Sequence, residues 1–211
     1  MTDPEMPPTP LTLIVAATPK NGIGKNGSLP WPMLKKEMAY FARVTKRLPP
    51  PPSSSSQETS RRNAVIMGRK TWASIPPKFR PLKDRTNIVV SSLSREELEG
   101  ATDEVIVAGS IQAGLADLEA RAREGRSPAL GRAFVIGGAG VYGAALGLEG
   151  ARNVLLTRVG REYECDTFFP DLEAEGWERR GRGELEEFVG EDVGGEQVDG
   201  EVGFEVQLWR R

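Results

Sequence analysis

Short apolar runs recur along the chain, and their length and composition are typical of buried β-strands. The run Leu11–Thr18 (LTLIVAAT) is almost continuously apolar and rich in β-branched residues, which predicts a strand covered on both faces. Similar runs predict strands at 63–67, 86–91, 104–108, 133–136 and 153–158. Residues 177–182 and 203–209 instead alternate between apolar and polar, which predicts an antiparallel hairpin near the end of the chain.

Segments with helical periodicity separate most of these strands. The predicted helices begin near Pro32, near Gly68, at Ser110, which is a suitable N-cap, and within GGAGVYGAAL after 133–136, with a short helical turn near Ser94. Strands that alternate with short helices predict an α/β fold in three layers. We expect a mostly parallel, twisted sheet with helices on both faces and antiparallel strands at one edge.

The length of the chain fits one globular domain, because 211 residues, 38% of them hydrophobic, are enough for a substantial core. Residues 1–10 form an N-terminal extension that lacks the basic and apolar regions of a signal peptide. Residues 47–62 (RLPPPPSSSSQETSRR) are rich in proline and serine and unsuited to a core, so we expect a surface insertion. Docking of a partner on this proline-rich stretch is the alternative.

Charge and residue content exclude several classes of function. The formal net charge of −2 gives no basic field for nucleic acid, and no apolar run of about 20 residues predicts a membrane span. We therefore expect no nucleic-acid partner, no membrane contact and a cytoplasmic location. The chain has no histidine and one cysteine, Cys165, which excludes Ser-His-Asp triads, internal disulfides and most zinc ligand sets. We expect no metal site.

One carboxylate lies on the apolar face of the helix that follows PWPM. At about 100° per residue, this face is formed by Met33, Phe41, Val44 and Leu48. Glu37 falls among them, where a carboxylate costs several kcal/mol unless it is paired, and tends to stay protonated. Two interpretations follow. The carboxylate belongs either to a buried salt bridge or to a site for a flat ligand whose amidine-like edge makes two charge-assisted hydrogen bonds.

Glycine patterns mark candidate nucleotide sites. Residues 21–27 (NGIGKNG) follow the first strand, but the next helix is delayed and no acidic residue lies about 20 positions on. We therefore interpret this segment as a glycine-hinged loop beside a ligand. Residues 137–143 (GGAGVYG) lie between a strand and a helix, where backbone N–H groups can bind a pyrophosphate. Tight helix–strand packing is the alternative there.

A pair of cations marks another helix start. Arg69, Lys70 and Thr71 follow Gly68, where a strand ends and a helix begins. Two cations at a helix N-terminus suit a 2′-phosphate, the group that distinguishes NADP from NAD. The alternative is a solvated basic turn.

Several blocks of the sequence together resemble dihydrofolate reductases of the eukaryotic, fungal-like type. The matching blocks, in the order of that family, are IVAAT, NGIGKNGSLPWP, LKKEMAYF, AVIMGRKTWASIP, RPLKDRTNIVVS, VIGGAGVY, LLTRV and DTFFP. They cover most of the chain from Leu11 to Pro170. The resemblance implies a dihydrofolate reductase-like fold with an eight-stranded sheet. It also implies NADPH-dependent reduction of 7,8-dihydrofolate to 5,6,7,8-tetrahydrofolate, with hydride transfer to C6 and protonation at N5.

The same resemblance implies roles for individual residues. Glu37 would bind the amino-amide edge of the pterin and support protonation through water, and Trp31 and Thr157 would hold the carboxylate and its water, with Tyr142 as a further catalytic residue. Arg80, in FRPLK, would clamp the α-carboxylate of the substrate. The pterin and nicotinamide pockets would be lined by Ile14, Val15, Ala16, Met38, Phe41, Ile75, Leu82, Ile136 and Tyr142.

For the cofactor, the resemblance implies three groups of residues. Those over the nicotinamide would be Ala17, Ile23, Gly24 and Lys25 in a mobile loop. Those at the adenosine phosphates would be Gly68, Arg69, Lys70, Thr71, Ser91 and Ser92. Those around the pyrophosphate would be Gly137, Gly138, Ala139, Gly140, Val141 and Tyr142, with a cis peptide bond between Gly137 and Gly138.

The chain also departs from the family pattern. Two arginines of vertebrate relatives are missing, with Ser92 at one position and Gly109 in the region of the other, so a preference for NADPH would rest more on Arg69. Antifolate inhibitors are expected to bind, and the family suggests a monomer. Met38 replaces an aromatic residue, which is expected to alter antifolate fit.

Two other functions stay open at this point. One is a reductase of the same fold that acts on another NADPH-linked heterocycle, such as a riboflavin precursor. The other is a nucleotide-binding or proline-motif scaffold without catalysis. Glu37 and Arg80 together argue for a pterin-like edge plus a glutamate carboxylate, and a scaffold has no reason to keep an acid on an apolar face.

Overall fold

The structure is a computed structural model that describes residues 8–50 and 60–211. The predicted N-terminal extension, 1–10, and the predicted insertion, 47–62, fall largely on residues 1–7 and 51–59, which lie outside the described residues.

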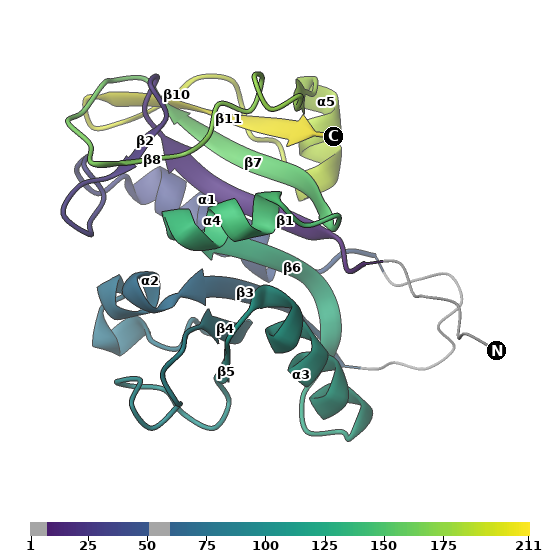
Figure 1. Ribbon diagram of the computed structural model, residues 1–211. Helices are drawn as coiled ribbons and strands as arrows, with labels where there is room; N and C mark the ends of the chain where they lie inside the picture. The colour runs from purple at the N-terminus through teal and green to yellow at the C-terminus, as the bar shows by residue number, and fades with distance from the viewer. Residues whose placement is uncertain (1–7, 51–59) are drawn as a thin grey trace.

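A twisted sheet forms the centre of the molecule (Figure 1). Eight of its strands follow the order β10-β11-β7-β1-β6-β3-β4-β5, and β9 pairs with β11 off this path. The bounds are β1 Leu11–Ala17, β3 Arg61–Gly68, β4 Thr86–Val90, β5 Ile106–Ala108, β6 Ala129–Gly137, β7 Ala151–Val159, β9 Glu178–Arg179, β10 Gln197–Asp199 and β11 Val202–Arg210. The pairs among β1, β3, β4, β5, β6 and β7 are parallel, whereas β11 runs antiparallel to its neighbours. The predicted mostly parallel sheet with an antiparallel C-terminal edge is confirmed.

Helices cover both faces of the sheet because its central strands are apolar on both sides. Their bounds are α1 Lys35–Lys46, α2 Arg69–Ser74, α3 Ile111–Arg123, α4 Ala139–Leu146 and α5 Arg182–Val189, with a 3-10 turn at Pro77–Phe79. Along β1, Leu13 packs with α3 and α4 into a first core. Ile14 packs with α1 and α5 into a second core on the other face of the sheet. The Ser110 hydroxyl accepts a hydrogen bond from the N–H of Ala113 at 3.1 Å, which confirms the predicted N-cap of α3.

The first helix differs from its prediction at both ends. It begins at Lys35 instead of near Pro32, and it ends at Lys46. Met33 and Leu48 therefore lie outside the helix and are 75% and 39% exposed, so their predicted place on the buried stripe was wrong. Tyr40, Val44 and Thr45 form the buried part of this face.

The C-terminal region also differs from its prediction. The predicted partners 177–182 and 203–209 do pair, but β9 contributes only Glu178 and Arg179 to that ladder. Helix α5 and strand β10 lie between them, and the true hairpin is β10–β11. A separate two-stranded sheet joins β2 (Gly22–Gly24) to β8 (Thr167–Phe168).

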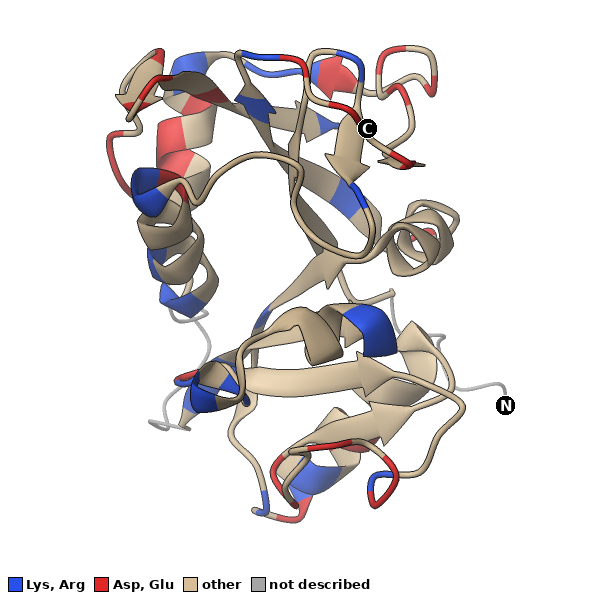
Figure 2. Ribbon diagram, turned by 90° about the vertical axis from the view of Figure 1, so that its left-hand side faces the viewer, with Lys and Arg blue, Asp and Glu red and all other residues tan. Residues whose placement is uncertain are grey.

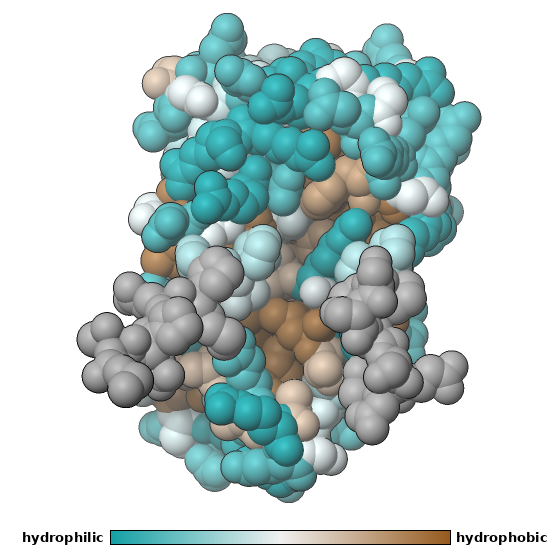
Figure 3. Space-filling model, turned by 90° about the vertical axis from the view of Figure 1, so that its right-hand side faces the viewer, coloured by the Kyte–Doolittle hydropathy of each residue, from teal (hydrophilic) through white to brown (hydrophobic). Residues whose placement is uncertain are grey.

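The carboxyl ends of the parallel strands meet at one edge of the sheet, on the side of the molecule that faces the viewer in Figure 2. Ala17, Gly68 and Gly137 end their strands there. The opposite end, shown in Figure 3, is where β3 starts at Arg61 and the chain enters β1 at Leu11. The edge with the carboxyl ends is where the predicted functional residues gather.

Candidate active site

Glu37 is the third residue of α1 and points toward β7. Its Oε1 atom accepts a hydrogen bond from the Thr157 hydroxyl at 3.3 Å. Burial raises the pKa of Glu37 from 4.5 to about 7, and the hydrogen bond from Thr157 opposes this increase only in part. No salt bridge within the described residues neutralises the carboxylate, so the predicted salt-bridge alternative has no partner there. The carboxylate is therefore a weak acid that titrates near neutral pH.

The other three predicted catalytic residues are all buried. Thr157 is 1% exposed and lies on β7, directly beside Ala16 of β1. Tyr142 of α4 donates a hydrogen bond from its hydroxyl to the Ile14 carbonyl at 2.7 Å, and burial raises its pKa. Trp31 is buried and packs edge-on against Tyr163, with ring centroids 6.2 Å apart. The structure thus brings the four predicted catalytic residues to the same edge of the sheet.

A partly open apolar surface lies next to Glu37. The second core leaves five of the predicted lining residues only partly buried, namely Ala16, Phe41, Ile75, Leu82 and Ile136. They come from β1, α1, the end of α2, the loop before β4, and β6. Because apolar side chains in a core are normally covered, this surface is a candidate for binding a flat apolar ligand.

The other predicted lining residues are placed differently. Ile14 and Val15 are 4% and 6% exposed, and their side chains belong to the two cores, so only their backbone can reach a ligand at this edge. Met38 is 48% exposed and lies on the outer flank of α1. Tyr142 packs against Phe169 in the first core.

Arg85 is a buried cation that the sequence analysis did not assign to the site. It lies directly before β4 and is 7% exposed. Its Nη1 atom donates to the Thr45 hydroxyl at 2.9 Å, its Nε atom donates to the Lys83 carbonyl at 3.0 Å, and its guanidinium carbon lies 6.0 Å from the centre of the Phe41 ring. Burial lowers the pKa of Arg85, and the charge of Asp84 only partly offsets this decrease.

Glu37, Phe41 and Thr45 are spaced four residues apart, so they lie in a row along one face of α1. Glu37 is at one end of this row, and Arg85 is bonded at the other end through Thr45. Eight residues of helix separate the two ends by roughly 12 Å. Along the helix, the row therefore presents first an acid, then an aromatic ring and then a guanidinium. This order suits an elongated ligand with a carboxylate at its far end.

Arg80, the predicted carboxylate clamp, is placed differently. Its side chain is 5% exposed and lies over the Trp72 ring, 5.6 Å from the ring centre. Nη1 donates to the Trp72 carbonyl at 3.4 Å, and Nη2 lies 3.5 Å from Glu99. A guanidinium enclosed in this way offers no open edge to a substrate carboxylate, so the geometry favours Arg85 for this position.

The predicted glycine cradle forms where α2 and α4 begin. The peptide bond between Gly137 and Gly138 is cis, as predicted. A Cβ atom on Gly137 would lie 3.0 Å from the Tyr142 ring, and one on Gly138 would lie 3.4 Å from the Thr71 hydroxyl. Within the described part of the chain, neither helix has a side-chain cap at its first turn, so the N–H groups of Ala139 and Gly140 have no partner there and can bind an anion.

Cations border this cradle. Arg69 and Lys70 are exposed at the start of α2, directly after Gly68. A Cβ atom on Gly68 would lie 3.1 Å from Val141 of α4, so the two helix starts are close neighbours. On the next strand, the Ser91 hydroxyl accepts a hydrogen bond from the Leu93 N–H at 3.0 Å. Ser92 is exposed, and nothing lies within 4 Å of where a Cβ would stand on Gly109.

The loop predicted to cover the nicotinamide is tied down by acidic residues that follow β7. Lys25 pairs with Glu164 at 2.5 Å, and the N–H of Asn26 donates to Asp166 at 2.7 Å. Directly before Lys25, Ile23 and Gly24 belong to strand β2, while Ala17 is fully buried at the end of β1. The loop therefore borders the same edge of the sheet as Glu37.

Among residues 8–50 and 60–211, no helix is both long and apolar enough to cross a membrane. In the same part of the chain, no group of three or more Cys, Asp or Glu side chains is arranged to hold a metal ion.

Comparison with known proteins identifies the chain's relatives. The family described as dihydrofolate reductase matches residues 54–190. The dihydrofolate reductase of Rattus norvegicus is 41% identical over 79% of this chain and 81% of its own length, and that of Pneumocystis carinii is 39% identical over 95% and 96%. The enzyme of Schizosaccharomyces pombe is 41% identical over 89% of this chain, but the chain spans only 42% of that relative. The solved Schistosoma mansoni dihydrofolate reductase has a TM-score of 0.72 and 32% identity over 96% of this chain and 98% of that one.

Proposed function

The chain belongs to the dihydrofolate reductase family of oxidoreductases, and from this premise we propose how its own residues reduce dihydrofolate to tetrahydrofolate with NADPH. One observation carries the proposal. Glu37 is a buried carboxyl group with a pKa of about 7, hydrogen-bonded to Thr157, beside apolar side chains that the core leaves partly open.

Glu37 binds the amino-amide edge of the pterin and provides for protonation at N5. A carboxylate accepts two parallel hydrogen bonds from such an edge, which fixes the orientation of the ring. A group with a pKa near the working pH can hold a proton and release it, whereas an ordinary glutamate is ionised there. Thr157 fixes the carboxyl group by its hydrogen bond. The proton passes from Glu37 to N5 through a single water molecule, and the buried Trp31 keeps other water away from the carboxyl group.

The partly open apolar surface positions the two flat rings. Phe41, Ile75 and Leu82 contact the substrate, while Ala16 and Ile136 at the strand ends contact both rings. When bound, NADPH supplies the hydride that is transferred to C6. The protein contributes orientation and the exclusion of water from the reacting atoms.

Arg85 binds the α-carboxylate at the far end of the substrate. Its guanidinium is held by Thr45 and Lys83 but by no carboxylate of the described residues, so it can form a bidentate pair with a ligand. Together with Glu37, it selects a ligand with a donor edge at one end and a carboxylate at the other. This pair argues against another heterocycle without such a tail.

The residues of the glycine cradle fit NADPH. Gly137 and Gly138 leave room that a Cβ would fill, and the free N–H groups at the start of α4 suit a pyrophosphate. Arg69, with Lys70 beside it, suits the 2′-phosphate that NADH lacks. Ser91 and Ser92 offer hydroxyls on the neighbouring strand end.

Two further properties follow as part of the same proposal. Antifolate inhibitors with a diaminopteridine-like edge bind Glu37 in place of the substrate, because they present the same donors to the carboxylate. The enzyme works as a monomer in the cytoplasm, with all site residues supplied by one chain.

The decisive experiment follows nicotinamide absorbance in purified protein with NADPH and dihydrofolate, against a control without dihydrofolate. We expect a substrate-dependent fall in absorbance that methotrexate abolishes. In Glu37→Gln we expect an intact fold, intact NADPH binding and loss of most turnover near neutral pH. A flat trace in the wild-type protein that still binds NADPH would contradict the proposed reaction, and unchanged turnover in Glu37→Gln would remove Glu37 from it.

A further inference from the structure

Helix α1, which carries Glu37, is held at its N-terminal end by a residue from the C-terminal hairpin. Asp199 ends β10, and its Oδ2 atom accepts a hydrogen bond from the backbone N–H of Lys36 at 2.6 Å. The ammonium group of Lys36 donates in addition to the Val198 carbonyl at 2.7 Å. Leu34, the N-cap residue of α1, has no capping side chain, so Asp199 supplies from outside the helix the acceptor that the first turn lacks.

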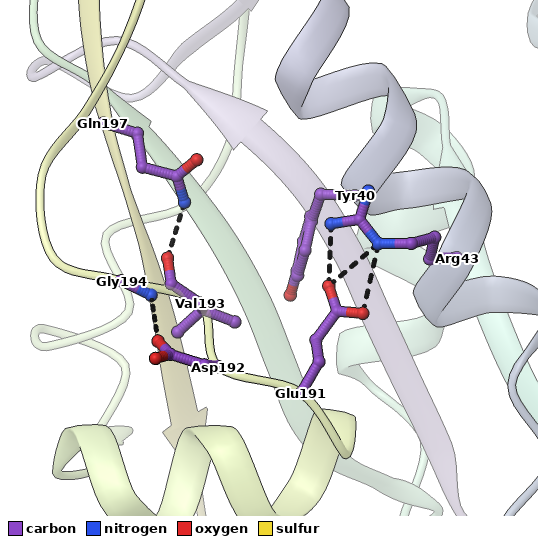
Figure 4. Close-up of a pocket in the computed structure, with 7 residues that line it drawn as sticks. All are labelled: Tyr40, Arg43, Glu191, Asp192, Val193, Gly194 and Gln197. Atoms are coloured by element: carbon purple, nitrogen blue, oxygen red, sulfur yellow. Dashed lines mark hydrogen bonds and ion pairs between the residues drawn. The ribbon is translucent and has the colours of Figure 1, made fainter.

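The C-terminal end of α1 is held by a second carboxylate of the same region, Glu191 (Figure 4). Arg43 donates to Glu191 from Nη2 at 2.9 Å and from Nε at 3.1 Å, and Arg47 donates from Nη2 at 2.8 Å. The side chain of Glu191 is only 14% exposed. Hydrogen bonds from Arg43 lower its pKa, so it is ionised throughout the neutral range.

The fold aims Glu191 at these arginines. Helix α5 ends at Val189, and the next residue, Gly190, has a φ of +73° and turns the chain toward α1. A Cβ atom at Gly190 would lie 3.1 Å from Cδ of Arg47, so the close approach requires glycine there. Arg47 also donates to the Val189 carbonyl at 2.7 Å, which ties the end of α5 to the end of α1.

Between these attachments, α1 and the segment after α5 are separated by a cavity of about 220 Å³ (Figure 4). Tyr40 of α1 lines it together with Val193 and Gln197, and the buried Tyr40 hydroxyl has no hydrogen-bond partner among residues 8–50 and 60–211. Tyr40 and Val193 both also belong to the core formed by α1 and α5, so the cavity is a local gap beside this apolar packing. The ion pair between Arg43 and Glu191 borders this cavity, and Arg47 bonds the same carboxylate, so removal of the Glu191 side chain breaks both contacts at once.

We propose that Glu191 and Asp199 are positioning residues: by holding the two ends of α1, they fix Glu37 opposite Thr157. This inference rests on the proposed role of Glu37 as the acid of the site. Glu37 directly follows Lys36, and it is six residues from Arg43, so both attachments act on the helix segment that carries it.

The hydrogen bond from Thr157 to Glu37 is already long at 3.3 Å, so a small displacement of α1 breaks it. The polar and titratable groups near Glu37 are Thr157 on β7, Tyr40 on its own helix and Tyr142 on α4, and neither tyrosine ionises in the neutral range. Burial is the main cause of the raised pKa of Glu37. A loosened helix admits water to the carboxylate, and its pKa then moves back toward 4.5.

The test compares Glu191→Ala and Asp199→Ala with Asp192→Ala. Asp192 is adjacent to Glu191 and also carries a carboxylate, but this carboxylate bonds Arg182 and the Gly194 N–H instead of α1. In the first two variants, we expect the KM for dihydrofolate to rise roughly three- to tenfold, with the KM for NADPH unchanged within about twofold. We also expect the upper midpoint of the pH profile of kcat/KM to fall by about half a unit. Asp199→Asn keeps the capping oxygen and should stay near wild type.

A second measurement does not depend on catalysis. Hydrogen exchange of the backbone amides of α1 in the ligand-free protein should become faster in Glu191→Ala and Asp199→Ala and stay unchanged in Asp192→Ala. Unchanged exchange and an unchanged pH midpoint in both variants would overturn the inference, as would an equal effect of Asp192→Ala. If Glu37→Gln abolishes turnover while these variants change nothing, the positioning role alone fails. If Glu37→Gln has no effect, the proposed function fails.

Discussion

At the scale of single residues, the environment of Glu37 predicts a pH dependence of catalysis. The protonated form dominates below its pKa of about 7, and above that value the fraction of protonated Glu37 falls about tenfold for each pH unit. We expect kcat/KM for dihydrofolate to decrease above pH 7 in the wild-type enzyme. In Glu37→Gln the residual kcat/KM should lose this transition. A transition that persists unchanged in the variant would assign it to another group.

The same pKa predicts an effect on stability with the opposite sign to that of an ordinary carboxylate. The folded protein binds the proton of Glu37 more tightly than the unfolded chain, whose pKa is 4.5. Its contribution to the free energy of unfolding is therefore complete below pH 4.5 and is lost as the pH rises through 7. Glu37→Gln should be about 3 kcal/mol more stable than wild type at pH 8 and nearly equal to it at pH 4.5, as measured by urea unfolding. A destabilised variant at pH 8 would contradict this burial.

Arg85 gives a prediction about the far end of the substrate. Arg85→Lys replaces a planar fork by a single point charge, so we expect a roughly tenfold higher KM for dihydrofolate, or about 1.4 kcal/mol. A pteridine substrate without the glutamate tail should show no change, because it has no carboxylate for this position. Arg80→Lys is the matched control and should leave both values near wild type. A higher KM for dihydrofolate in Arg80→Lys, with no change in Arg85→Lys, would instead assign the binding of the α-carboxylate to Arg80.

The two arginines also show what the sequence leaves open at this scale. Glu37 stands out in sequence because helical periodicity places a charge on an apolar face, a conflict that is visible without a structure. Arg80 and Arg85 lie in one polar loop, RPLKDR, where no periodicity tells an inward side chain from an outward one. The contacts that separate them, Trp72 for Arg80 and Thr45 for Arg85, come from distant parts of the chain. The place of Arg85 directly before an apolar strand was the available signal.

At the scale of elements, the paired starts of α2 and α4 predict cofactor selectivity. Arg69→Ala removes a cation beside the glycine cradle, and we expect a roughly five- to tenfold weaker affinity for NADPH with little change for NADH. Arg62→Ala, at the opposite end of β3, is the control and should change neither affinity. Fluorescence titration of the ligand-free protein measures both. An equal loss for the two cofactors would place Arg69 away from the 2′-phosphate.

Elements whose signal is local were predicted, and those that depend on tertiary contacts were not. The buried strands and the Ser110 cap were visible as apolar runs and as a local hydrogen-bonding residue. Helix α5 has apolar residues at Leu185, Phe188 and Val189 with helical spacing, but eight residues between glycines give too short a pattern to decide. Strands β2 and β8 consist of three and two residues and exist only because they pair with each other.

At the scale of the whole molecule, the candidate site and the proline- and serine-rich segment 47–62 are associated with opposite ends of the sheet. The candidate site lies at the carboxyl ends of the parallel strands, and residues 47–62 enter β3 at its amino end. Strand β3 runs from Arg61 to Gly68, which separates the two ends by roughly 23 Å. The two described flanks of the insertion are joined by a hydrogen bond from Nη2 of Arg61 to the Pro49 carbonyl at 2.8 Å. The second flank is also attached to β6, because the N–H of Ala129 donates to the Ser60 carbonyl at 2.9 Å.

This separation predicts that part of the insertion can be removed without loss of activity. Deletion of residues 51–56 keeps Pro49, Ser60 and Arg61, so the bonds that start β3 remain. Surface loops tolerate changes in length at little cost in free energy, because closure entropy varies only slowly with loop length. We expect kcat and both KM values to stay within about twofold of wild type, and the midpoint of thermal unfolding to change by no more than a few degrees. A KM for dihydrofolate that rises while stability is unchanged would show that the insertion acts on the site from a distance. The insertion would then contribute to the function of the enzyme.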